Sequence, residues 1–133
     1  MNRLFVIAGC ALLGSAIVSA AKNTRTLPAG TWGGEHILLQ VSVKGAEIEF
    51  DCARGQIAQS LRLDAHGNFA VSGTFTPEHG GPVLRDEEGS GTQASYSGHV
   101  VGDAMRLTVT RKGEKLGSFM LTRGRQPNLR KCR

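Results

Sequence analysis

The chain has 133 residues, of which 40% are hydrophobic and 5% aromatic, and it carries a formal net charge of +5 at pH 7. A chain of this length suits one small domain. No aromatic residue lies among the basic residues near the C-terminus. This composition argues against a base-stacking platform, so we expect no specific nucleic-acid partner.

The first twenty residues have the features of an export signal. Arg3 precedes an apolar run from Leu4 to Val18, and small residues follow at the expected cleavage point. The run is shorter than the ~20 apolar residues of a membrane-spanning helix. We therefore expect a signal peptide over residues 1–20, a secreted or periplasmic protein, and no transmembrane segment after cleavage.

Cys10 allows a second interpretation of this segment. Residues 7–10 are similar to a bacterial lipobox, in which the cysteine carries a lipid. However, the apolar run continues well past Cys10, and very few residues precede it. The flanking sequence therefore favours signal cleavage over lipidation.

Removal of the signal leaves residues 21–133, which we interpret as a single domain with a basic C-terminal tail. Cys52 and Cys132 are the two cysteines that remain. An even number of cysteines in an exported chain indicates a disulfide, and this one would fasten the tail to the end of a strand.

Residues 37–52 are typical of a β-hairpin. Apolar residues occupy every second position in two runs, so each run lines one face of a strand. A turn at Lys44–Gly45 would pair Val43 with Ala46 and would place the two glutamates of the second run in solvent. A shift of one residue would bury those glutamates, so the assignment of faces is strongly specified. The apolar positions are Ile37, Leu39, Val41, Val43, Ala46, Ile48, Phe50 and Cys52.

Further alternating runs follow, separated by turns that contain glycine. Residues 77–92 form the longest connection and carry Pro, Gly and an acidic run. About seven or eight short strands joined by close turns indicate an all-β fold, an antiparallel up-and-down β-barrel with one disulfide. These runs include residues 61–63, 69–75, 94–100, 105–109 and 117–121.

Gly30-Thr31-Trp32 resembles the Gly-x-Trp signature of the calycin barrels, which include the lipocalins and avidins. The resemblance implies that a basic residue near the last strand packs over the tryptophan, and Arg123 has the required position. Trp32, Tyr96 and Arg123 are the candidate ligand-binding residues. Alternatively, Trp32 plugs the closed end of a small barrel.

A second resemblance covers most of the domain. Residues 30–34, 50–53, 78–82 and 131–132 resemble short exported bacterial proteins of unassigned function. This resemblance supports the barrel and the export of the chain, and it implies no activity.

Two Glu-His pairs lie in glycine-rich segments and are the candidates for metal chemistry. His36, Glu78 and His79 have the donor atoms that zinc or copper uses, although their spacing matches no metal motif. Surface residues near turns are the alternative interpretation. No nucleophile motif frames any serine or histidine, so we expect neither an enzyme nor a cofactor.

The sequence therefore predicts an exported, monomeric, non-catalytic binding protein. Its partner would be an unknown protein or an envelope component that is recognised at the surface. The alternative is a lipocalin-like carrier of a small apolar ligand, and the third class is a hydrolase or metal-binding protein. A filled barrel would favour surface recognition, and a hollow beside Trp32 would favour a carrier.

Overall fold

A computed structural model describes residue 14 and residues 24–78 and 91–132. Three predicted features lie outside the described residues: the signal peptide apart from residue 14, with Cys10; the candidate ligand His79; and most of the 77–92 connection. Within the described part of the chain, no helix is long and apolar enough to cross a membrane.

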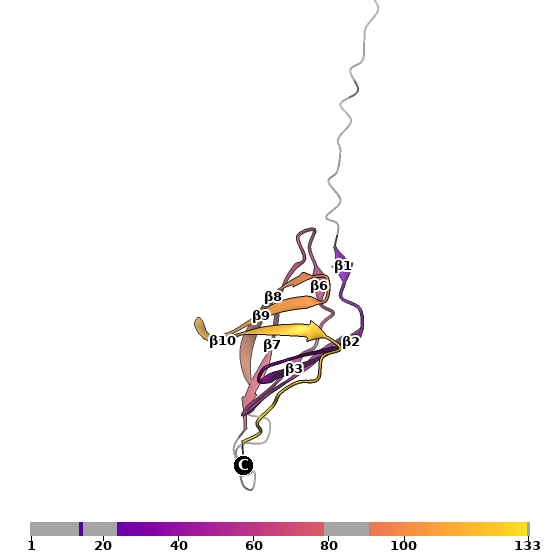
Figure 1. The fold of residues 1–133 in the computed structure, drawn as a ribbon. Helices are drawn as coiled ribbons and strands as arrows, with labels where there is room; N and C mark the ends of the chain where they lie inside the picture. The colour runs from indigo at the N-terminus through magenta and orange to yellow at the C-terminus, as the bar shows by residue number, and fades with distance from the viewer. Residues whose placement is uncertain (1–13, 15–23, 79–90, 133) are drawn as a thin grey trace, which may run out of the picture.

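The domain is a closed barrel of eight antiparallel strands in up-and-down order (Figure 1). This arrangement confirms the predicted all-β fold. In spatial order the strands are β10 (Glu114–Arg123), β2 (Gly30–Gly34), β3 (Ile37–Ser42), β4 (Gly45–Phe50), β5 (Ala53–Ile57), β7 (Asn68–Pro77), β8 (Thr92–Val101) and β9 (Ala104–Arg111).

A small separate sheet covers the upper end of the barrel in Figure 1. Strand β1 (Arg25–Thr26) pairs with β6 (Arg62–Leu63), and the backbone N–H of Leu27 donates to the carbonyl of Leu61 at 2.8 Å. The side chains of Leu27, Leu61 and Leu63 are buried in the main core. These side chains close this end of the barrel. Their burial is favourable because it removes apolar surface from water.

The predicted hairpin is present, but its predicted register is wrong by two residues. Val41, not Val43, pairs with Ala46, and the two-residue loop is Val43–Lys44. Gly45 belongs to β4, where a β-carbon would clash with the backbone carbonyl of Ile57. Val43 is 71% exposed at the turn. Because side chains alternate with a period of two, the shift leaves the other residues on their predicted faces.

Side chains fill the interior of the barrel. Trp32, Tyr96, Leu39 and Leu107 have no exposed surface, and the remaining buried side chains form one continuous cluster with them. Inward-facing glycines make room for the larger rings, since a β-carbon on Gly98 would clash with the ring of Phe69. The interior is therefore a packed core along most of its length.

Candidate functional site

Trp32 is an internal residue. The guanidinium carbon of Arg123 lies 4.8 Å from the centre of its ring, which confirms the contact predicted from the sequence. Arg123 also pairs with Asp103 at 3.5 Å between Nε and Oδ1. The indole Nε1 has no hydrogen-bond partner among the described residues. A ligand would reach this ring only by displacing packed side chains, so the geometry agrees with a plug.

Tyr96 also lies inside the wall. Its hydroxyl donates to the carbonyl of Thr74 at 2.6 Å, and its ring passes over Gly73 and Gly55, where any β-carbon would clash with it. Burial raises the pKa of Tyr96 to about 12. Trp32 and Tyr96 are therefore brought into one core, and neither is placed on an accessible surface.

The buried phenol predicts a loss of stability in alkali. An unfolded tyrosine ionises near pH 10, so between about pH 10 and 12 the unfolded chain has released a proton that the folded chain retains. The free energy of unfolding should fall there by up to about 1.4 kcal/mol per pH unit. Urea titrations at several pH values should show a shallower decline for Tyr96→Phe. An identical decline in the variant would contradict this account.

An aromatic mouth lies at the end of the barrel opposite β1 and β6. The ring centres of Phe75 and Phe119 lie 5.5 and 5.4 Å from that of Phe50, and both outer rings are only partly buried. The guanidinium of Arg111 lies 5.4 Å from the ring of Phe75. We call this site the aromatic mouth. It is a hollow of about 270 Å³ lined by His36, Phe50, Asp51, Cys52, Ala53, Phe75, Val109, Leu116 and Phe119.

Asp51 organises the polar rim of the mouth. Its carboxylate contacts His36 Nδ1 at 2.6 Å and accepts the backbone N–H of Arg130 at 2.7 Å. Its carbonyl accepts the backbone N–H of Cys132 at 3.2 Å. The hydrogen bond from Arg130, together with His36, holds the pKa of Asp51 below its usual value. The rim therefore carries an ionised carboxylate at neutral pH.

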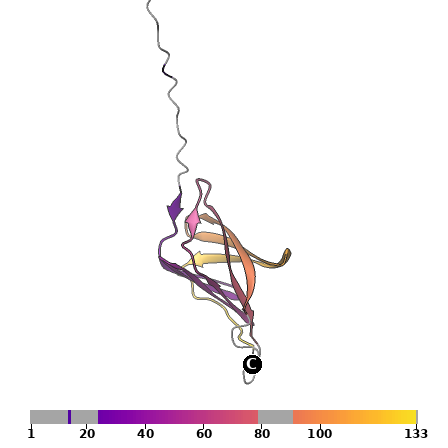
Figure 2. The ribbon, with the colours of Figure 1, turned by 180° about the vertical axis from the view of Figure 1, so that it is seen from behind.

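The C-terminal tail, residues 124–132, runs down the outside of β2 to this rim (Figure 2). A β-carbon on Gly33 would clash with the carbonyl of Arg125, so the tail lies directly on the strand backbone. The Cys52–Cys132 disulfide fastens it at the mouth, as predicted. The tail also donates a hydrogen bond from Lys131 Nζ to the carbonyl of Phe50 at 3.0 Å.

Two ion pairs neutralise part of the positive charge of the tail. Arg125 pairs with Glu35 at 3.1 Å, and Lys131 pairs with Glu78 at 3.0 Å. Asn128 adds a hydrogen bond to the other oxygen of Glu35 at 2.8 Å. These contacts hold the tail to the barrel, and they leave less unpaired charge to attract an anionic polymer.

Two of the candidate metal ligands, His36 and Glu78, have charged partners in the structure. His36 contacts Asp51, and Glu78 contacts Lys131, while His79 lies outside the described residues. Among the residues that the structure describes, no group of three or more His, Cys, Asp or Glu side chains could hold a metal ion. His36 and Glu78 thus both lie near the mouth and have protein partners there.

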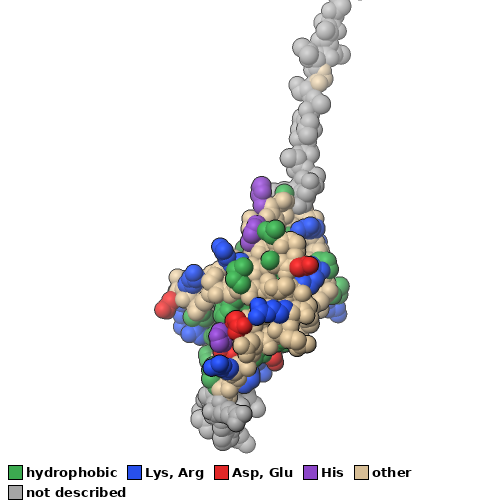
Figure 3. All heavy atoms as spheres, in the orientation of Figure 1, with side chains coloured by type: hydrophobic (Ala, Val, Ile, Leu, Met, Phe, Trp, Pro, Cys, Tyr) green, Lys and Arg blue, Asp and Glu red, His purple; other side chains and the backbone are tan. Residues whose placement is uncertain are grey.

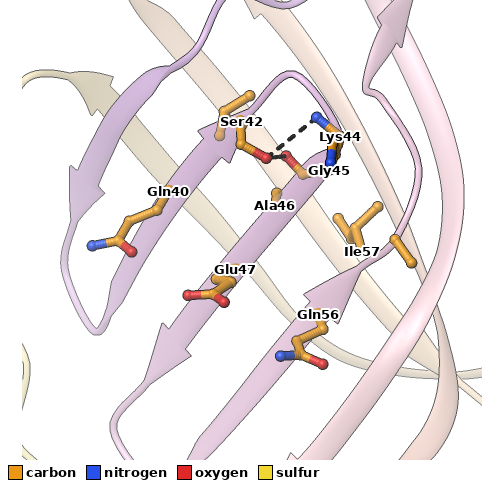
Figure 4. Close-up of a pocket in the computed structure, with 10 residues that line it drawn as sticks. Gln40, Ser42, Lys44, Gly45, Ala46, Glu47, Gln56 and Ile57 are labelled. Carbon is orange, nitrogen blue, oxygen red and sulfur yellow. Dashed lines mark hydrogen bonds between the residues drawn. The ribbon is translucent and has the colours of Figure 1, made fainter.

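A larger hollow, of about 460 Å³, lies on the outside of β3, β4 and β5. Gln40, Glu47 and Gln56 form a cross-strand row along it (Figure 4). At the adjoining turn, Ser42 Oγ donates to the carbonyl of Gly45 at 3.3 Å and accepts the backbone N–H of Lys44 at 3.3 Å. Gln40, Glu47 and Gln56 are exposed, so their polar groups can remain hydrated without a ligand.

The sequence singled out His36 and Cys52 for other roles, but it did not identify the three phenylalanines of the aromatic mouth as a site. The sequence placed Phe50 on the apolar face of the hairpin, and it placed Phe75 and Phe119 only within two further alternating runs. The three rings belong to β4, β7 and β10, which are not adjacent in the barrel, so their meeting at one end depends on the strand order and register of the closed barrel. Comparison of the chain with protein-family models, curated proteins and solved structures finds no match.

Proposed function

We propose that the protein is an exported, non-catalytic binding protein that holds an apolar side chain of a macromolecular partner in the aromatic mouth. The observation that supports this proposal is the set of partly exposed phenylalanine rings at one end of an otherwise filled barrel. If these rings served only as core residues, we would expect them to be fully buried, as Leu27, Leu61 and Leu63 are at the other end of the barrel.

The size of the mouth favours a side chain over a whole ligand. Pockets for drug-sized molecules measure about 300–1,000 Å³, and the mouth has about 270 Å³. Burying one large apolar side chain contributes roughly 1.5–3 kcal/mol, and an aromatic pair adds about 0.5–1.5 kcal/mol. Such a contact is adequate as the anchor of a protein interface, where a few residues contribute most of the affinity.

A calycin-like carrier of a small apolar ligand is the second candidate. The contact of Arg123 with Trp32 and the closed eight-strand barrel support this kinship. The packed interior argues against it, because a carrier needs an internal volume for its ligand. The first candidate predicts that one side chain binds in the aromatic mouth, and the second predicts that a whole apolar ligand binds inside the barrel. Titration with a probe for each therefore separates them.

The test uses two probes, N-acetyl-L-phenylalaninamide and the ten-carbon fatty acid decanoate. We expect the aromatic amide to shift the NMR signals of Phe50, Phe75 and Phe119. Leu116→Glu should weaken this binding at least tenfold, because Leu116 lines the mouth and a carboxylate there would lose water when the apolar probe binds. Met120→Glu is the matched control, since Met120 is 58% exposed and does not line the mouth.

Two results would count against surface recognition. Tight decanoate binding that quenches Trp32 fluorescence would replace the proposal with the carrier. Equal weakening by both glutamate variants would place the contact elsewhere on β10. Because both replaced side chains are exposed, each variant should keep the circular dichroism spectrum of the parent protein.

A further inference from the structure

Strand β10 has a long edge without a strand partner in the described part of the chain. It pairs with β9 from Glu114 to Thr122, but β2 meets its other edge only at Leu121, Thr122 and Arg123. The hairpin of β9 and β10 consequently projects beyond the barrel wall (Figures 1 and 2). An unpaired edge of this kind is a template for another extended chain.

The register identifies the backbone groups on this edge. The N–H of Gly124 donates to the carbonyl of Thr31 at 2.8 Å, so Gly124 faces β2. Alternate residues of an antiparallel strand face the same neighbour, and therefore Thr122, Met120 and Ser118 face that side as well. Ser118 lies beyond the last pair with β2, so its N–H and carbonyl point along the open edge.

The open edge borders the aromatic mouth. Leu116 and Phe119 of β10 line one side of the mouth, and Phe50 lines the other. A register shift between Lys115 and Gly117 bends the strand at this point. An added strand beside β10 would direct every second side chain to the inner face, where the mouth can receive a large apolar one.

The charge of the hairpin tip indicates the chemistry of the added chain. Figure 3 shows basic side chains beside an acidic one at the projecting tip. Three cationic side chains and one carboxylate favour an acidic partner, and a second copy would bring two basic hairpins together. The tip carries Arg111, Lys112, Glu114 and Lys115.

The hairpin is held in place for such a contact. Lys112 and Gly113 have positive φ values of 52° and 76°, as a tight two-residue turn between twisted strands requires. Thr108 Oγ1 and Ser118 Oγ lie 3.2 Å apart across the two strands. The edge therefore belongs to a strand that is already paired with β9, and a partner strand would add hydrogen bonds without first having to order the hairpin.

We infer that an extended, acidic polypeptide segment pairs with the free edge of β10 and inserts one large apolar side chain into the aromatic mouth. This inference rests on the proposed function and names its class of partner. Main-chain hydrogen bonds would supply affinity independent of sequence, and the mouth would select the inserted residue.

The test selects binders from a phage-displayed library of random ten-residue peptides. We expect enriched peptides to be acidic and to contain a large apolar residue. Their affinity should fall at least tenfold for Ser118→Pro, which removes one edge N–H and leaves the hydrogen bonds to β9. Ser118→Ala is the matched control, since it keeps the N–H and loses only the hydroxyl contact with Thr108.

A second measurement covers the case in which Ser118→Pro does not fold. Hydrogen exchange of the Ser118 amide in the parent protein should slow at least tenfold when a selected peptide is bound. Unchanged exchange, or peptides that bind Ser118→Pro as tightly as the parent, would overturn strand addition. If N-acetyl-L-phenylalaninamide still binds in a manner sensitive to Leu116→Glu, the proposed function would survive that failure.

Other occupants of the edge give different results. A dimer that dissociates on Ser118→Pro in light scattering would assign the edge to a second copy of the chain. Peptide binding that appears only after residues 79–90 are replaced by a Gly-Ser linker would assign it to this chain itself. Either result would overturn an external acidic partner.

Discussion

Replacement of Cys52 and Cys132 by serine is expected to lower the free energy of unfolding by about 4–5 kcal/mol. The disulfide joins residues 80 positions apart, and a loop of this length restricts the unfolded chain strongly. The loss corresponds to a decrease of about 15–20 °C in Tm for a domain of this size. Urea denaturation of the oxidised protein and of the double variant measures the difference directly.

Reduction of the parent protein supplies the control for this experiment. The reduced protein and the double variant should have the same stability, because both lack the same covalent constraint. The hydrogen bonds of the tail to Asp51 contribute only about 0.5–1.5 kcal/mol each and cannot replace it. A double variant within about 1 kcal/mol of the parent would show that the tail is held mainly by its noncovalent contacts.

Trp32→Ala is expected to cost about 3–5 kcal/mol, the range for truncation of a large buried aromatic side chain. Trp32 has no exposed surface and packs under Arg123. The change would leave a cavity beside the seam between β2 and β10, where few residues pair. Thermal and urea unfolding of the variant provide the measurement.

Arg123→Gln separates the cation–π contact from the burial of the indole. This variant should lose about 0.5–2 kcal/mol, the contribution of a cation over a tryptophan ring. In the background of Trp32→Ala the same replacement should cost less, since the ring is gone. Equal costs in both backgrounds would assign the effect of Arg123 to its ion pair with Asp103.

Hydrophobic alternation determined which face each residue occupies, but it did not determine the register of the hairpin. Lys44–Gly45 and Val43–Lys44 are both two-residue loops, and apart from Val43 both keep the same apolar residues on the inner face. The choice between them depends on the close approach of Ile57 to Gly45. That contact involves a strand that the local sequence does not specify.

Strand β5 was missed for a related reason. Its inward positions are Ala53, Gly55 and Ile57, of which only one is a large apolar residue. Gly55 is small because Tyr96 of another strand occupies the space in front of it. A pattern of small residues is thus informative only when the side chain that fills the gap is known.

The candidate site was harder to predict than the fold. The sequence indicated Trp32, Tyr96 and Arg123, and the structure gathers the first two in the core. The exposure of Phe119 depends on how far β10 extends past β2, which is a property of the closed barrel. No local pattern contains this information.

The short pairing between β2 and β10 also makes folding depend on the order in which the strands are synthesised. Leu121, Thr122 and Arg123 close the barrel against residues 32–34, and Cys132 must then reach Cys52. A nascent chain that ends before Leu121 therefore lacks every pair that closes the cylinder. During synthesis, β2 to β9 can form only an open sheet, so the final step of folding waits for the last strand.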